Sequence, residues 1–176
     1  MSILKDLKNQ MLFENLDEEE LTIFADNITK MQLSKGDPIF RENEPTLGLY
    51  LVKDGEVQIT RQMPVDLKTK MLITVRNVQN CCEIIKTPQG WKQVFANLVS
   101  GNFFGELSIV EGRKKHGADA DAIEDTELYL IKAEVFNEIE TANPAVMIKI
   151  LRTIAKYSSK RLRLLDRQLL KLIIGF

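Results

Sequence analysis

The chain has 176 residues, of which 44% are apolar and 28% are charged, and its net charge is −1 at pH 7. These values are typical of one globular domain that is large enough to bury a hydrophobic core. No run of about 18 apolar residues occurs, which excludes a membrane-spanning helix, and the first residues lack the apolar stretch of a secretory signal. We therefore expect a cytoplasmic protein in which the adjacent Cys81 and Cys82 stay reduced.

The first helical signal begins at Asp17. Acidic residues follow it, and Leu21, Phe24 and Ile28 then recur at helical spacing. Asp17 is a favourable N-cap, and Glu20, three residues later, can reach back to it. The pattern predicts a capping box at the start of this helix.

Short apolar runs separated by turns follow this helix. We expect strands at 31–33, 39–40, 49–52, 57–60, 71–75, 91–99 and 127–131. The Asp54-Gly55 pair predicts a tight hairpin, because glycine tolerates the positive φ of such a turn. Strands this short favour a β-roll or sandwich over a βαβ fold. The segment 62–90 is less regular and indicates either a longer hairpin or an insertion.

Two helices are predicted after residue 131, one at 133–140 and one that starts at Pro144 in the first helical position. The second carries a heptad seam of Leu151, Ala155, Ser158, Leu162, Leu165, Leu169 and Leu172. This spacing is typical of a coiled-coil pair and predicts a homodimer. The alternative is a helix that packs on the core of its own chain. Further apolar residues lie off the seam, at Ile150, Ile154, Leu164 and Leu170, so one helix could do both.

The charge is unevenly distributed. Residues 144–176 carry eight Lys or Arg and one acid, Asp166. The simplest explanation is pairing with acidic residues of the same or a neighbouring subunit. Binding to nucleic acid, anionic lipid or an acidic partner is the alternative.

No catalytic set is evident. The single histidine excludes a two-histidine metal site and leaves little material for a histidine-based triad. A P-loop and a dinucleotide fingerprint are also absent. We expect no enzyme, no metal and no cofactor.

The most informative stretch is 101–110, which contains Phe104, Gly105 and Glu106. It predicts a strand end, a glycine turn and a short helix. The glycine lets backbone N–H groups approach a ligand, the helix start suits an anion, and Glu106 could accept hydrogen bonds from a sugar hydroxyl.

The sequence FFGELSIV at 103–110 resembles the phosphate-binding cassette of the cyclic-nucleotide-binding domain family. Residues 12–21 resemble the entering helix of that family, 35–60 its first strands and 143–165 the helices after the roll. The resemblance implies a jelly-roll-like β-roll, mainly β with flanking helices, at 1–143. A dimerisation or signal helix at 144–176 would belong to the same domain.

The resemblance also implies ligand contacts. After Phe104 and Gly105, Glu106 would hold the ribose 2′-hydroxyl of cyclic AMP or cyclic GMP, and the backbone amides of Leu107 and Ser108 would hold the cyclic phosphate.

The family has a phosphate-binding arginine further along the chain, and this sequence departs from that pattern. Alignment on Ala118, Ala120 and Ala122 puts His116 at the arginine position and Gly117 after it, whereas another spacing puts Lys115 there. Arg113 could also replace the arginine if the loop shifts.

Asp119 and Asp121 alternate with the three alanines, so they lie on the opposite face of the strand. If the alanines line the pocket, we expect both aspartates to face solvent; a register slip would turn them inward.

The sequence favours a stand-alone sensor that binds a cyclic nucleotide or a related anion weakly and signals through its last helix. The alternative is a degenerate roll that acts as a scaffold for a partner protein. No helix-turn-helix segment follows the basic helix, so we do not expect sequence-specific DNA binding.

Overall fold

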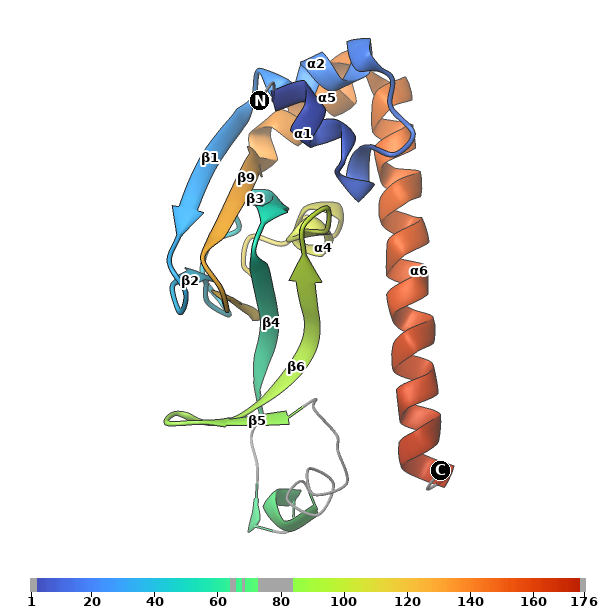
Figure 1. Cartoon of the computed structure of the whole chain (residues 1–176). Helices are drawn as coiled ribbons and strands as arrows, with labels where there is room; N and C mark the ends of the chain where they lie inside the picture. Colours follow the sequence, from blue (N-terminus) through green and yellow to red (C-terminus); the bar gives the residue numbers. More distant parts are fainter. Residues whose placement is uncertain (1–2, 64–65, 68, 73–83, 175–176) are drawn as a thin grey trace. The chain divides into compact units, whose positions relative to one another are not determined.

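The structure is a computed structural model that describes residues 3–63, 66–67, 69–72 and 84–174, without the side chains of residues 165 and 168–174. It divides into two compact units. The helical unit comprises residues 1–27 and 134–176, and the roll unit comprises residues 28–133. Figure 1 shows the elements of both units. Cys81 and Cys82 lie outside the described residues.

The described part of the roll unit contains two antiparallel sheets. One has the strand order β1-β9-β3-β7 and the other has the order β2-β8-β4-β6-β5. Their bounds are β1 (Ile28–Leu33), β2 (Pro38–Phe40), β3 (Gly48–Asp54), β4 (Glu56–Met63), β5 (Ile84–Thr87), β6 (Gly90–Val99), β7 (Phe103–Phe104), β8 (Asp119–Ala122) and β9 (Thr126–Lys132). The predicted roll with flanking helices, including a long C-terminal helix, is confirmed.

The core of the roll lies between these sheets, because alternate side chains of each strand point to the same face. It contains Phe40, Tyr50, Val52, Val57, Leu98, Phe104, Ala120, Leu128 and Leu130. β3, β7 and β9 contribute from one sheet, and β2, β4, β6 and β8 contribute from the other.

Most of the local predictions for the roll are confirmed. Gly55 adopts φ +85° between β3 and β4, as the hairpin requires. The expectation of a strand at 71–75 is wrong where it can be checked, because Met71 and Leu72 are helical. Residues 73–75 lie outside the described part. Both side chains are exposed, so these two residues do not enter the core.

The helical unit contains α1 (Ile3–Lys8), the 3-10 helix η1 (Met11–Phe13), α2 (Glu18–Ala25), α5 (Ala133–Ala142) and α6 (Pro144–Ile174). The predicted capping box at α2 is present, with Asp17 accepting from the Glu20 N–H and Glu20 accepting from the Asp17 N–H. Phe24 joins α2 to its neighbours, because its ring centroid lies 4.8 Å from that of Phe13 and 6.4 Å from that of Phe136.

α6 packs within the helical unit through residues that lie off the heptad seam. Ile150 and Ile154 are buried, and Lys149 Nζ lies 2.6 Å from Glu20 Oε1. Lys156 makes a second ion pair at 2.6 Å, with Glu14. Two of the basic residues are thus paired with acids of the same chain, as the simpler explanation of the charge asymmetry expects.

The heptad seam lies on another face of α6. Leu151 and Leu162 are 41% and 68% exposed, Ala155 is exposed and Ser158 is half-buried. The side chains of Leu165, Leu169 and Leu172 lie outside the described part. Within the described residues, no helix is long and apolar enough to cross a membrane.

Candidate functional site

The predicted glycine turn joins β7 to the short helix α4 (Glu106–Val110). Gly105 adopts φ +83°, in the left-handed region, and forms the N-cap of α4. A Cβ at this position would lie 2.8 Å from the carbonyl oxygen of Gly48 and 3.3 Å from Tyr50 Cδ2. The turn therefore requires glycine for its conformation and for its close approach to β3.

The cassette residues beside this turn are divided between the interior and the surface. Phe104 is buried and stacks on Tyr50, with 5.0 Å between ring centroids. Glu106 and Ser108 are also buried, whereas the side chain of Leu107 is exposed. The turn and the first residues of α4 therefore place a carboxyl group and a hydroxyl group inside the protein.

His116 occupies the interior and Lys115 the surface. The His116 ring stacks on Phe40 with 3.6 Å between centroids and an interplanar angle of 3°. Phe40 also contacts Phe104, at 5.9 Å between centroids. The side chain of Lys115 is exposed, and its backbone forms an isolated bridge with Pro45. Of the two candidates for the arginine position, His116 is the one that points inward.

The loop after β2 holds His116 by its backbone. The Asn43 N–H donates to the His116 carbonyl at 2.9 Å, and the His116 N–H donates to the Glu44 carbonyl at 2.9 Å. The Thr46 N–H donates to the carbonyl of Lys114 at 3.0 Å. These backbone hydrogen bonds between the two loops therefore fix where the His116 ring lies.

The buried imidazole is held in its neutral form. Burial lowers the pKa of His116 from its ordinary value of 6.5, and the carboxylate of Glu44 opposes this shift too weakly to reverse it. At neutral pH the His116 ring therefore carries no charge.

Three buried polar atoms in this region have no hydrogen-bond partner among the described residues. They are His116 Nε2, the hydroxyl of Tyr50 and Oγ1 of Thr46. Burial, with a smaller contribution from Glu44, raises the pKa of Tyr50 to about 12, so its hydroxyl stays protonated. Such orphaned groups are costly unless a ligand or water satisfies them. Sequence reasoning did not place Phe40, Thr46 or Tyr50 at the site, because strand pairing and not sequence proximity brings them near His116.

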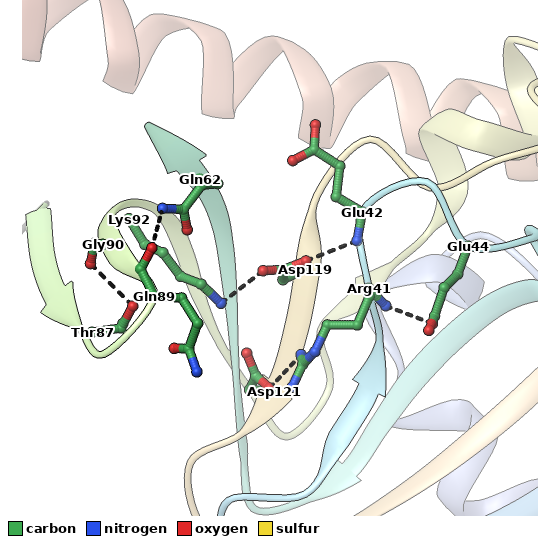
Figure 2. Close-up of polar contacts among 10 residues, drawn as sticks. All are labelled: Arg41, Glu42, Glu44, Gln62, Thr87, Gln89, Gly90, Lys92, Asp119 and Asp121. Atoms are coloured by element: carbon green, nitrogen blue, oxygen red, sulfur yellow. Dashed lines mark hydrogen bonds and ion pairs between the residues drawn. The ribbon is translucent and has the colours of Figure 1, made fainter. Parts of the chain in front are cut away.

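The expectation of a solvent-facing side chain is wrong for Asp119, and both Asp119 and Asp121 form ion pairs (Figure 2). Ala120 and Ala122 are fully buried, so the aspartates do lie on the opposite face of β8. Asp119 is nevertheless buried there, paired with Lys92 at 2.7 Å, and it accepts a hydrogen bond from the Glu42 N–H at 2.8 Å. Asp121 is half-buried and pairs with Arg41 at 2.5 Å.

Among the described residues, no group of three or more His, Cys, Asp or Glu could hold a metal ion. Gly117, after His116, is half-buried, and a Cβ there would lie 3.3 Å from Arg113 Nη1.

We predict that lowering the pH below 6.5 destabilises the protein through His116. The unfolded chain gains a proton near that pH, whereas the folded chain, with its lowered pKa, does not. The stability is fully present above pH 6.5 and is lost as the pH falls to the pKa of the folded state, with a slope of at most about 1.4 kcal/mol per pH unit. Urea unfolding between pH 7.5 and 5.0 measures this slope.

His116→Phe is the control for this prediction, because it keeps an aromatic ring on Phe40 and removes the titration. His116 is the single histidine of the chain, so the slope just below pH 6.5 should disappear in the variant. Equal slopes in both proteins would show that His116 is not the titrating group.

Comparison with known proteins identifies the class. The family model that describes the cyclic nucleotide-binding domain matches residues 79–143 of the sequence. The solved structure of the catabolite activator protein of Thermus thermophilus is 25% identical, with a TM-score of 0.65, and the match covers 93% of this chain and 63% of that one. A cyclic nucleotide-binding domain from Methylobacillus flagellatus KT has a TM-score of 0.70 at 20% identity, covering 97% and 82% of the two chains.

A similar curated protein is an uncharacterized NTE family protein of Mycobacterium tuberculosis, 23% identical over 150 residues. The match covers 85% of this chain but 21% of the relative, so the chain spans about a fifth of the length of that protein.

The two sheets, the Gly105 turn and the flanking helices define a β-roll of the cyclic-nucleotide-binding type. The resemblance seen in the sequence is confirmed, because the family model matches residues 79–143 and the solved structures share the fold.

Proposed function

We propose that the roll binds a cyclic nucleotide, cyclic AMP or cyclic GMP, or a related small anion, and that binding is signalled through α6. The observation that carries this proposal is the buried Glu106 directly after Gly105. Glu106 is the residue to which the resemblance assigns the ribose hydroxyl.

Weak affinity is part of this proposal, because His116 replaces an arginine with a neutral ring. A charge-assisted hydrogen bond to phosphate contributes about 1.5–3 kcal/mol, and only arginine makes it bidentate. Its loss weakens binding by about 10- to 100-fold where no other arginine of the chain takes over the contact. The same observation favours the second candidate function, a roll that no longer binds a nucleotide and serves as an assembly scaffold.

We also propose that α6 pairs two copies of the chain. Leu151, Ala155 and Leu162 are exposed at heptad spacing, while the buried Ile150 and Ile154 belong to the packing of the helical unit. The helix therefore has one face for its own unit and a second apolar face for a partner. Sedimentation equilibrium of the purified chain, with and without cyclic nucleotide, reads the dimer and its dependence on ligand.

Calorimetric titration of the nucleotide-stripped protein with cyclic AMP and cyclic GMP tests the binding. We expect micromolar or weaker binding of one of them. Glu106→Gln should weaken that binding about 10- to 100-fold, since it replaces a charged acceptor by a neutral one of the same shape.

Glu124→Gln is the matched control, because its side chain is exposed outside the site, and it should leave the affinity unchanged. Thermal melting of both variants checks that they are folded. No heat from the unmodified chain with either nucleotide would contradict the sensor proposal and favour the scaffold.

A further inference from the structure

The loop from Glu111 to Gly117 connects α4 to β8 and is fixed at both ends. The Arg113 N–H donates to the Ser108 carbonyl at 2.8 Å, which ties the loop to the cassette helix. At the other end, His116 and Lys114 are bonded through their backbones to the loop after β2. The position of Arg113 relative to Ser108 and Gly117 is therefore defined by hydrogen bonds.

The guanidinium group of Arg113 lies over the residue that follows His116. Arg113 Nη1 is 3.3 Å from the position that a Cβ of Gly117 would take. An alanine at 117 would thus press directly against the guanidinium. The sequence places glycine where the resemblance leads one to expect a hydroxyl-bearing or small residue, and this glycine leaves room for Arg113.

Arg113 is paired with an acidic side chain of the same loop. Its Nε forms an ion pair with the carboxylate of Glu111, two residues earlier, and both side chains are largely exposed. Exposed ion pairs contribute little stability, so an incoming phosphate can replace Glu111 at small cost. The guanidinium would exchange the Glu111 carboxylate for the phosphate of the ligand, and both anions can accept two hydrogen bonds from it.

The other candidate cations of this loop are less suitable. His116 is buried and stacked on Phe40, and the side chains of Lys114 and Lys115 are exposed. Lysine also lacks the planar fork that matches a phosphate. Among the described residues of the loop, Arg113 combines permanent charge, fork geometry and a backbone anchor on Ser108.

We propose that Arg113 is the phosphate-binding residue of this site, in place of the residue at position 116, and that Glu111 occupies its guanidinium until the ligand arrives. The ligand class is a cyclic phosphodiester with one negative charge. This inference rests on the proposed function, because it assigns the anion contact of the same site.

Calorimetry with cyclic AMP and cyclic GMP on four proteins tests the proposal. Arg113→Gln should weaken binding at least about tenfold. Lys114→Gln removes the same charge one residue away. It should change the affinity less than about threefold, because dissolved salt screens the attraction between an exposed charge and the ligand. Glu111→Gln frees the guanidinium and should tighten binding by a few fold.

Equal effects of Arg113→Gln and Lys114→Gln would overturn the assignment while leaving nucleotide binding by the roll intact. His116→Arg is titrated beside these proteins. It distinguishes a competent pocket that lacks a phosphate contact from a roll that binds no cyclic nucleotide. Binding by His116→Arg with silence from the unmodified chain would show that Arg113 does not supply the phosphate contact in an otherwise competent pocket. Silence from both would contradict the proposed function itself, and the assignment with it.

Discussion

Replacing Lys92 by methionine is expected to lower the free energy of unfolding by about 3–5 kcal/mol. Lys92 Nζ lies 2.7 Å from the carboxylate of Asp119, and the two side chains are 15% and 11% exposed. The variant leaves Asp119 buried with the Glu42 N–H as its hydrogen-bond donor. An uncompensated charge at this depth is costly, because water cannot solvate it. Urea unfolding at pH 7 measures the loss.

Two further variants separate burial from charge. Lys8→Met removes a lysine from an exposed pair with Glu18, where the side chains are 66% and 78% exposed. We expect it to cost less than about 1 kcal/mol. The double variant Lys92→Met/Asp119→Leu removes both charges and should recover most of the stability. A loss at Lys92 no larger than that at Lys8 would contradict the account.

The pair also governs how Asp119 titrates. Burial by itself raises the pKa of Asp119, but the hydrogen bonds from Lys92 and from the Glu42 backbone outweigh it and lower the pKa below 3.8. The resulting stability is present above the ordinary pKa and is lost as the pH falls through the lowered value. The destabilisation by Lys92→Met should therefore shrink in strong acid.

The charged cluster on this face of β8 supports the site on the other side of the strand. Asp119 holds the backbone of Glu42, and Asp121 pairs with Arg41 (Figure 2). The loop that begins there carries the backbone groups that fix His116. Ion pairs on one face of β8 thus contribute to the placement of the His116 ring on the other side of the strand.

Local patterns in the sequence predicted the elements that depend on neighbours along the chain. The capping box of α2 needs only Asp17 and Glu20, and the turns at Gly55 and Gly105 need only a residue that tolerates positive φ. The alternation of alanines and aspartates correctly separated the two faces of β8. These features are set within a few residues, so the sequence alone could reveal them.

The environment of those faces could not be predicted in the same way. Asp119 can be buried because its partner Lys92 reaches it from β6. β6 is not the neighbour of β8 in the sheet, since β4 lies between them. His116 is buried because Phe40 comes from β2, which pairs with β8. Both contacts depend on strand order, which the apolar pattern does not encode. The sequence showed His116 in the loop before β8, but it did not show the stacking of its ring on Phe40 or its neutral charge.

Gly48→Ala is expected to destabilise the protein by about 4 kcal/mol or more, at the upper end for single substitutions. A Cβ at Gly48 would lie 2.1 Å from the carbonyl oxygen of Ile131 and 2.8 Å from Lys132 Cα, both in the backbone of β9. Side-chain rotation cannot relieve a collision with backbone, so β3 and β9 would have to separate. Urea unfolding measures the loss, and a failure to fold would agree with it.

Gly112→Ala is the control, because Gly112 has φ +62° but nothing within 4 Å of an added Cβ. It should cost about 1–2 kcal/mol from backbone strain alone. A Gly48→Ala protein as stable as Gly112→Ala would contradict the collision. The carbonyl oxygen of Gly48 is also the atom nearest to a Cβ at Gly105. The Gly105 turn therefore packs against β3, the same strand that cannot accept a side chain at position 48. Displacing β3 should therefore move Gly105, and the cyclic-nucleotide titration of any folded Gly48→Ala protein should show weaker binding than that of Gly112→Ala.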